Sequence, residues 1–504
     1  MDRRKKLKLN TVVSIAQRVV TILCGFILPR LFLKHFGSEV NGLVSSIAQF
    51  LSLITIFDSG MGVIIEASLY KPLADGDQAA ISRVMTSGQK FYSKLVILLS
   101  VYVLGVALIY PNFVCDRFGF FYTFFLVFAI SISHFGQYCI GVTNGLLLSA
   151  DQKGYINYTA SIVTVLLNTG ISILLILLNC PVQIVKLASS MVFLSRPIFL
   201  ALYVKKHYKV NWKEHYETEP IKQKWNGVAQ HVAAIVLTDT DVVVLTLFST
   251  LKNVSIYSVY LLVINGIRSL LSATTAGIKP IFGNMIAKEE WKTLNNTFSY
   301  VEWGLHTLTT LLFSLVCVLI VPFVKIYTKG VDDANYLLPT FALILSIAYS
   351  IYCYRIPYLD IVMAAGKFKE TQASAIIEAI INIVVSVVMV FKFGLVGVAI
   401  GTLVAMTYRL IYLVFFIRKN ILKRNITFFI KNFLVDAAIF SSIYFLSLVV
   451  YREVESVGDW IVLAFTYGGI GLGVVLLFNL LFYRANVIKI WKTLLLPIRK
   501  KKST

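Results

Sequence analysis

The sequence predicts an all-α integral membrane protein of about fourteen transmembrane helices. These form two six-helix lobes related by a parallel repeat, with two extra helices at the C-terminus. Three observations lead there. The chain of 504 residues is 58% hydrophobic and only 14% charged, whereas soluble proteins have about 25% charged residues. Apolar runs long enough to span a bilayer recur from end to end. Finally, residues in the first half recur in the second at a constant spacing.

That spacing is 214 residues, and no gap is needed to maintain it. The recurring residues are Tyr138, Cys139, Ala150, Lys153, Asn168 and Ser172, which match Tyr352, Cys353, Ala364, Lys367, Asn382 and Ser386, together with Val40 and Ile64, which match Val254 and Ile278. Duplicated helical units with a site between the copies are a common plan for transporters. We therefore interpret the chain as one membrane unit present twice.

The apolar runs define the individual helices in chain order. The predicted spans are 11–34, 40–65, 90–111, 118–148, 156–178, 182–204, 227–249, 254–280, 298–322, 335–365, 371–391, 394–417, 429–451 and 458–483. Six spans is an even number, so the two copies have the same orientation in the membrane, as in parallel-repeat transporters. The last two spans have no counterpart in either copy.

The distribution of basic residues orients these spans. With both termini placed in the cytoplasm, the inner segments hold 31 Lys and Arg residues and the outer segments hold 7. This bias is what the positive-inside rule expects, and a missed span would scramble it. The predicted domains are an N-terminal lobe (1–204), a cytoplasmic linker (205–226), a C-terminal lobe (227–418), and two extra helices with a basic tail (419–504).

The net charge of +22 does not predict a nucleic-acid partner, because the basic residues lie in loops between apolar runs and form no patch with interleaved aromatics. No nucleotide-binding, hydrolase or paired metal-ligand motif is present, so we expect neither an enzyme nor a cofactor. The outer loops are short and leave no domain for chemistry outside the membrane.

Nine basic residues remain inside predicted spans when those in loops or at helix ends are set aside, and five of the nine are arginines roughly 12–18 Å from the cytoplasmic end at 1.5 Å per residue. A lipid-facing Arg costs at least about 2.5–3.5 kcal/mol at the bilayer centre. The five deep arginines should therefore face a watery cavity, partner carboxylates, or both. The five are Arg18, Arg196, Arg268, Arg355 and Arg409, while Arg30 lies near the outer end of the first span.

Five intramembrane acids are the expected charge partners or ion-coupling groups. They are Asp58, Asp239, Asp241, Asp360 and Glu378. Asp239 and Asp241 lie about 200° apart on a helix and so point to different faces. Two interpretations stay open: structural ion pairs within each lobe, or a functional site. The functional one is favoured for Arg18, Asp58, Asp239 and Arg268, which lie on the first two spans of each copy.

Several stretches resemble bacterial polysaccharide transporters. They are FGSEVNGLVSSIAQFLSLITIFDSGMGVIIEASLYKPL (36–73), GLLLSADQKGYIN (145–157), TDTDVVVLTLFSTLKNVSIYSVY (238–260) and RIPYLDIVMAAGKFKETQ (355–372). The chain up to about 420 is most similar to the Wzx-type O-antigen and capsule flippases. These belong to the MATE-like multidrug/oligosaccharidyl-lipid/polysaccharide (MOP) superfamily.

The resemblance implies a two-lobed alternating-access flippase in the bacterial inner membrane. Its cargo would be an undecaprenyl-diphosphate-linked oligosaccharide used for lipopolysaccharide or capsule, and its driving force an ion gradient of protons or Na⁺. Membrane lipids and other polysaccharide-assembly membrane proteins are the expected partners. In related lipid II flippases, cavity arginines contact the diphosphate. By span and depth, Arg18 and Arg268 fit that role here, with Arg355 and Arg30 as further candidates.

Two alternatives are weighed against this function. A multidrug antiporter of the same superfamily would need a cavity dominated by carboxylates, and charge alone does not separate it from a flippase. A membrane polysaccharide polymerase or glycosyltransferase generally needs a sizeable outer loop, which this chain lacks. The glycan that is carried, the coupling ion and the oligomeric state cannot be read from the sequence.

Overall fold

The computed structural model describes residues 3–58, 60–114, 117–212, 214, 221, 240–275, 278–450 and 452–488. The chain divides into two compact units, Met1–Ser255 and Ile256–Thr504. Their boundary falls inside one helix and does not coincide with a predicted lobe limit. Most of the predicted linker 205–226 lies outside the described residues, so the predicted domain limits stay predictions.

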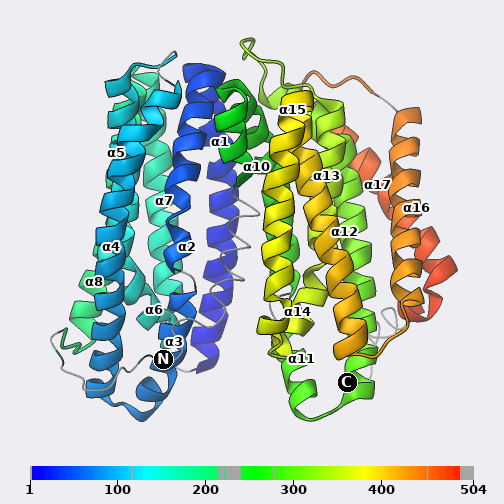
Figure 1. The fold of residues 1–504 in the computed structure, drawn as a ribbon, viewed down its shortest axis with the longest axis horizontal. Helices are drawn as coiled ribbons and strands as arrows, with labels where there is room; N and C mark the ends of the chain where they lie inside the picture. The colour runs from blue at the N-terminus through cyan, green and yellow to red at the C-terminus, as the bar shows by residue number, and fades with distance from the viewer. Residues whose placement is uncertain are drawn as a thin grey trace, which may run out of the picture. The chain divides into compact units, whose positions relative to one another are not determined.

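Unit 1 is a bundle of long helices in which α1 packs on α7, α7 on α8, α8 on α5, and α5 on α4 (Figure 1). Its elements are α1 (Arg3–Ser52), α2 (Thr55–Asp58), α3 (Met61–Asp75), α4 (Gln78–Val114), α5 (Phe120–Gly136), the π-helix η1 (Gln137–Gly141), α6 (Val142–Ala150), α7 (Gly154–Leu177) and α8 (Val182–His207). Apolar side chains such as Leu43, Ile47 and Leu99 form its buried core.

In unit 2, α12 packs against α13, α16 and α17, and α13 packs against α15. Its elements are α10 (Leu251–Thr275), which begins in unit 1, and α11 (Ile278–Ala287), α12 (Trp291–Tyr327), α13 (Pro339–Tyr354), α14 (Ile356–Ala364), α15 (Phe368–Asn420), α16 (Thr427–Val449) and α17 (Val457–Phe482). The two extra C-terminal helices, α16 and α17, are therefore part of the packing of this unit.

Two of the longest helices are each interrupted by a glycine. In α15, Gly394 has φ 54° and ψ −127°, and the chain reverses there. Asn382 donates a hydrogen bond to Thr402 at 3.2 Å across the resulting hairpin. In α1, Gly37 has φ 80° and ψ 176°. Positive φ is accessible to glycine without steric cost. Gly37 falls between the predicted spans 11–34 and 40–65, and Gly394 is the first residue of the predicted span 394–417, directly after the gap that follows 371–391.

Eleven helices among the described residues are long and apolar enough to cross a membrane, including the two interrupted ones. Large apolar side chains also cover the outward faces, for example Val101, Leu177, Phe391 and Phe465. The protein is thus an all-helical, multi-pass membrane protein. The count of fourteen spans stays a prediction, because most of the predicted span 227–249 lies outside the described residues.

Three predicted spans are not continuous helices. The span 40–65 breaks between α1, α2 and α3; the span 118–148 contains η1; and the span 335–365 breaks at Arg355, where Pro357 follows in the first turn of α14. Proline lacks the N–H that a continuous helix requires. The π-helix 137–141 and the junction at 355 lie at matching positions of the 214-residue spacing, beside the recurring Tyr-Cys pair.

Candidate functional site

In unit 1, the candidate arginines lie on α1. Arg18 and Arg30 are both exposed on this helix. Asp58, at the end of α2, accepts a hydrogen bond from the Tyr92 hydroxyl at 2.9 Å, and the Tyr92 ring stacks on Tyr138. Asp58 therefore lies at a break in a membrane helix, beside two aromatic rings. Unwound membrane helices commonly line binding sites in transporters.

The predicted seventh span contains two acids, Asp239 and Asp241. Asp239 lies outside the described residues. Asp241 is buried in the helical segment 240–248, with 1% of its surface exposed. Asp360 of α14 is half-buried in unit 2 and interacts electrostatically with Lys279 of α11.

Arg268 lies on α10 over two tyrosines of α13. Its guanidinium carbon is 5.2 Å from the centre of the Tyr352 ring and 5.9 Å from that of Tyr349. Cation–π contact at such distances contributes about 0.5–2 kcal/mol, depending on desolvation. Within the described part of the chain, no carboxylate forms an ion pair with Arg268. Its N–H groups are therefore not neutralised by an acid there.

Arg355 contacts the same ring. Its guanidinium carbon is 4.1 Å from the centre of the Tyr352 ring, so Tyr352 contacts two guanidinium groups. Arg355 also forms an ion pair with Glu378, whose second oxygen is 3.6 Å from Arg409. All three charged side chains are buried. A buried charge is costly unless paired, and this Arg–Glu–Arg group leaves one net positive charge beside Tyr352.

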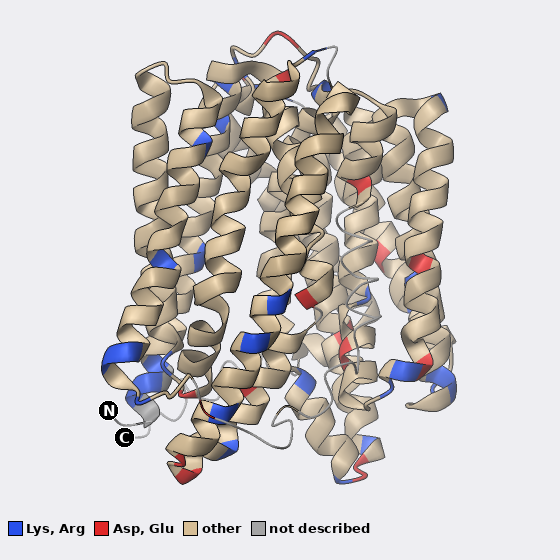
Figure 2. Ribbon diagram, turned by 60° about the vertical axis from the view of Figure 1, so that its left-hand side comes forward, with Lys and Arg blue, Asp and Glu red and all other residues tan. Residues whose placement is uncertain are grey.

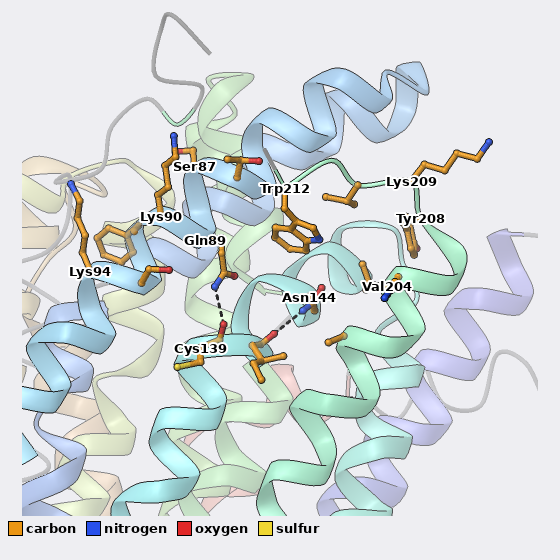
Figure 3. Close-up of a pocket in the computed structure, with 17 residues that line it drawn as sticks. Ser87, Gln89, Lys90, Lys94, Cys139, Asn144, Val204, Tyr208, Lys209 and Trp212 are labelled. Carbon is orange, nitrogen blue, oxygen red and sulfur yellow. Dashed lines mark hydrogen bonds between the residues drawn. The ribbon is translucent and has the colours of Figure 1, made fainter. Parts of the chain in front are cut away.

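A pocket with a volume of about 1040 Å³ lies in unit 1 (Figure 3). It lies between α4, the η1–α6 segment, α8 and residues 208–212. Four lysines line it, namely Lys90, Lys94, Lys205 and Lys209, together with the aromatic residues Phe91, Tyr208 and Trp212. Lysine ammonium groups attract anions, and an indole ring gives a flat apolar surface, so the pocket suits an anionic group attached to a larger body.

The π-helix forms one wall of this pocket. A π-turn leaves backbone carbonyls without their usual partners, and side chains satisfy two of them here. Gln89 donates to the Cys139 carbonyl at 2.8 Å, and Asn144 donates to the Ile140 carbonyl at 2.7 Å (Figure 3). Single π-turns of this kind occur frequently at functional sites.

In unit 1, basic residues gather at the end of the helices where the chain starts (Figure 2). Asp151 lies in this region and binds Lys153 at 2.7 Å and Lys6 at 3.2 Å, and it also accepts a hydrogen bond from Tyr208. Burial raises the pKa of Asp151, but hydrogen bonds from Lys153 and Tyr208 and the charge of Lys153 outweigh this effect. Its pKa is therefore below the usual value. The cluster ties the start of α1 to the end of α8.

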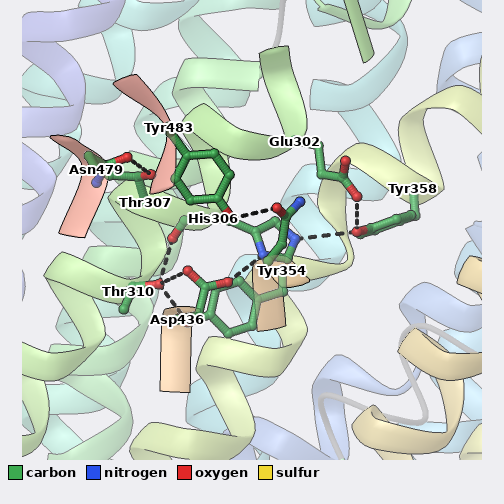
Figure 4. Close-up of polar contacts among 10 residues, drawn as sticks. Glu302, His306, Thr307, Thr310, Tyr354, Tyr358, Asp436, Asn479 and Tyr483 are labelled. Carbon is green, nitrogen blue, oxygen red and sulfur yellow. Dashed lines mark hydrogen bonds and ion pairs between the residues drawn. The ribbon is translucent and has the colours of Figure 1, made fainter. Parts of the chain in front are cut away.

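Sequence reasoning missed a polar group in unit 2. Glu302, His306 and Asp436 are buried among α12, α14 and α16, and they are linked by hydrogen bonds (Figure 4). All three lie inside predicted spans. Glu302 and His306 are four residues apart, on one face of a helix. That spacing of an acid and a histidine within an apolar run was the signal that could have found them.

No group of three or more His, Cys, Asp or Glu side chains in the described part of the chain is arranged to hold a metal ion. The candidate groups among the described residues are charged and aromatic side chains. In unit 1 they are Asp58 with Tyr92 and Tyr138, and the pocket lysines. In unit 2 they are Arg268 with Tyr352.

Comparison with known proteins finds similarity in structure alone. No family model matches the sequence, and no curated protein sequence matches it. The lipid II flippase MurJ, in an inward closed conformation, is similar with a TM-score of 0.68 and 16% identity, covering 95% of this chain and 99% of that one. An inward-facing multidrug resistance MATE transporter of the MOP superfamily has a TM-score of 0.61 and 12% identity, covering 81% and 98%.

The MATE multidrug transporter DinF-BH is also similar, with a TM-score of 0.58 and 16% identity over 82% of this chain and 95% of that one. These neighbours include a lipid flippase and drug transporters, so the similarity does not separate the two kinds of cargo. At these identities it establishes architecture. The chain has the fold of the MOP-superfamily transporters.

Proposed function

We propose that the protein is a flippase that moves an undecaprenyl-diphosphate-linked oligosaccharide from the cytoplasmic to the outer leaflet for surface polysaccharide export. The observation that carries this proposal is Arg268. It is partly buried on α10, over two tyrosine rings and without a carboxylate partner among the described residues. A diphosphate is the kind of group that such an arginine binds strongly and in a bidentate manner.

Each predicted site residue has a place in this proposal. Arg18 and Arg268 bind the diphosphate, and Arg30 contributes near the outer end of the first span. Arg355 acts through Tyr352, whose ring both Arg355 and Arg268 contact. Asp58, Asp239, Asp241 and Asp360 are the charge partners or coupling groups, whereas Glu378 balances the buried Arg355 and Arg409. The cycle is alternating access, driven by an ion gradient.

The basic pocket of unit 1 supports an anionic cargo. Four lysines and a tryptophan line a cavity large enough for a phosphorylated sugar. It lies at the end of the helices where the sequence predicts the cytoplasmic face, so it would meet the diphosphate headgroup before translocation. These lysines would repel the cationic cargo of a multidrug antiporter. We therefore favour a lipid-linked glycan as the cargo.

The test is Arg268→Ala beside Arg268→Lys in a cell that makes surface polysaccharide. Arg452→Ala, at an exposed position in the segment before α17, is the matched control. We expect the Ala variant to lose surface polymer and to accumulate lipid-linked oligosaccharide facing the cytoplasm, at a normal protein level. The Lys variant should retain partial activity, because it keeps the charge without the bidentate geometry.

Unchanged surface polymer in the Arg268→Ala cells would remove Arg268 from the site. The deletion strain addresses the cargo itself. Intact polysaccharide with raised sensitivity to cationic dyes would identify a drug exporter instead.

A further inference from the structure

The polar group buried in unit 2 is a connected chain of hydrogen bonds. Asp436 of α16 is 2.6 Å from Nδ1 of His306, on α12. Nε2 of His306 is 3.4 Å from the hydroxyl oxygen of Tyr358, on α14, and that hydroxyl donates to Glu302. Figure 4 shows these side chains pointing toward one another from three helices. Arg424, in the segment between α15 and α16, completes the chain by binding Glu302 at 2.6 Å.

The charges in this group do not balance without a proton. Glu302 and Asp436 are negative and Arg424 is positive, so a neutral His306 leaves one net negative charge. A protonated His306 makes the sum zero. His306 is 2% exposed, and both carboxylates are 5% exposed or less. Because an uncompensated charge is costly to bury, this geometry favours the uptake of one proton.

The hydrogen-bond directions show how that proton is accommodated. A tyrosine hydroxyl has a single hydrogen. When Tyr358 donates it to Glu302, as in this structure, its oxygen accepts a hydrogen bond from Nε2 of His306, while Nδ1 donates to Asp436. When the proton leaves, Nε2 becomes an acceptor, and the Tyr358 hydrogen can turn from Glu302 to His306. One proton therefore decides which of the two neighbours Tyr358 binds.

A path for the proton adjoins Glu302. A small cavity of about 30 Å³ is lined by Glu302, Tyr358 and Arg424 and by the exposed residues Arg418 and Asn425. Such a volume holds about one water molecule. The cavity thus connects the buried chain with the segment that the sequence predicts to lie in the cytoplasm.

The other polar groups around His306 are uncharged. Tyr354 of α13 stacks on the imidazole ring, and Thr310 lies 2.7 Å from Asp436 and 2.8 Å from the Tyr354 hydroxyl. Tyr483 and Asn479, from the end of α17, line the same region (Figure 4). Arg418 of α15 is the further charge beside the cavity. Arg418 is exposed, and among the described residues it forms no ion pair with Glu302 or Asp436. The uncharged groups supply no positive charge at His306.

We propose that the Asp436–His306–Tyr358–Glu302 chain is a proton-binding site, reached through the Arg424 cavity. Its proton controls whether Tyr358 of α14 is bonded to Glu302 or to His306 of α12, and it sets the charge of the His306–Asp436 pair that joins α12 to α16. This site is separate from the arginines assigned to the cargo. Its use in transport rests on the proposed function, whereas proton binding itself does not.

The first test follows the protonation of His306 in the full-length protein, labelled with ¹⁵N-histidine and reconstituted into lipid bilayers. Imidazole ¹⁵N shifts distinguish the charged ring from the neutral one. The His306 signals are those lost in His306→Gln. The control is His134→Gln, which changes a different histidine that is half-buried. We expect His306 to change form between about pH 5 and 9, a range that brackets the usual histidine pKa.

In Asp436→Asn the ring should remain neutral throughout this range, because Arg424 already offsets Glu302. A His306 that keeps one protonation state over the whole range in the wild-type protein would overturn the proposal. Titration unaltered by Asp436→Asn would do the same. Tyr358→Phe, compared with Tyr354→Phe, should move the His306 signals much more, and it provides the assignment if His306→Gln does not fold.

The second test measures movement of a labelled lipid-linked oligosaccharide in proteoliposomes under an imposed pH gradient. Acceleration by the gradient should be present in His134→Gln and lost in His306→Gln and Asp436→Asn. If His306 titrates but the wild-type protein moves no lipid-linked cargo, the proposed function fails and the proton site stands. If cargo moves with no response to the gradient and His306 does not titrate, the proton site fails alone.

Discussion

At the scale of single residues, burial decides which charges are fixed and which are available. Arg355 and Arg409 share Glu378 in the interior of unit 2. Arg268 contacts the same tyrosine as Arg355 but has no acid beside it in the described part of the chain. Arg355 and Arg409 are therefore partly compensated, whereas Arg268 has no acid partner among the described residues, so Arg268 gains most from an anionic ligand.

Removing the shared acid should destabilise unit 2. In Glu378→Gln, two buried guanidinium groups lose their counter-charge, a change that typically costs about 3–5 kcal/mol. Glu370 is the matched control, because it lies on the same helix and pairs with Lys367 at an exposed site. We expect a lower thermal transition for Glu378→Gln in detergent and no measurable change for Glu370→Gln. Equal transitions would mean that the Arg–Glu–Arg group adds nothing to stability.

Tyr352 should matter through its ring. Tyr352→Leu removes the face that contacts both Arg268 and Arg355, while Tyr352→Phe keeps it. We therefore expect reduced export of surface polymer in the Leu variant and near-normal export in the Phe variant, at matched protein levels. Equal loss in both variants would assign the effect to the hydroxyl group instead.

The sequence predicted some of the charged residues of the candidate site but not their partners. Depth along the apolar runs found the intramembrane arginines, because an apolar run shows any charge within it. The ion-pair partners of these arginines could not be predicted, because pairing depends on helix rotation and on contacts between distant segments. The same survey overlooked Glu302, His306 and Asp436, whose link through Tyr358 joins three helices.

At the scale of elements, the apolar runs located the helices well but hid their interruptions. The breaks at Asp58, η1 and Arg355 lie inside runs that are apolar on both sides, so composition gives no sign of them. The turn at Gly394 was visible only as a short gap between two predicted spans. The tight packing across that turn required the structure.

The α15 hairpin has no room for a side chain at Gly401. A Cβ there would lie 2.1 Å from the Ser386 hydroxyl and 2.7 Å from its backbone nitrogen. Gly401→Ala should therefore destabilise the protein, by about 1–3 kcal/mol for an overpacked site. Gly469 of α17 meets nothing within 4 Å, so Gly469→Ala should be neutral or stabilising by up to about 1 kcal/mol. Thermal unfolding of the two variants should differ in sign, and a shift of the same sign would contradict the packing.

The Asp151 cluster should hold the start of α1 in a pH-dependent way. The folded pKa of Asp151 is depressed, so its contribution is present above the unfolded value of about 3.9. It is lost as pH falls through the folded pKa. Hydrogen exchange at residues 5–10, corrected for intrinsic rates, should stay constant above about pH 5 and rise below about pH 4.

Asp151→Asn should raise this exchange at every pH, because the carboxylate that binds Lys6 and Lys153 is gone. Asp75→Asn, at an exposed position at the end of α3, is the control and should have no effect. Protection of residues 5–10 that survives in Asp151→Asn would show that the helix start is held by α1–α7 packing alone.

At the scale of the whole molecule, composition was enough to predict a multi-pass helical membrane protein. A bilayer requires long apolar helices whose backbone hydrogen bonds are satisfied within the segment. The long apolar runs of the sequence meet this requirement. Composition does not predict the cargo, because cargo recognition depends on a few side chains within a common architecture. The structural neighbours include both a lipid flippase and drug transporters.

Ligand-dependent stability can separate these two kinds of cargo in the intact protein. A ligand that binds the folded state raises the free energy of unfolding, by about 2.7 kcal/mol at 100 times its Kd. If the cargo is anionic, undecaprenyl diphosphate should raise the thermal transition of the purified protein, and a cationic dye should not. High salt should weaken the effect at the exposed pocket lysines more than at Arg268, because buried charges are screened less.

Two variants apportion the effect of undecaprenyl diphosphate between the two units. Arg268→Ala should remove the salt-resistant part, and Lys90→Ala with Lys94→Ala should remove the salt-sensitive part. Undecaprenyl monophosphate should stabilise less, since it lacks the second phosphate for bidentate contact. Stabilisation by the dye and not by the diphosphate would instead indicate a cation-binding cavity, and the arginine assignment would then have to be abandoned for the molecule as a whole.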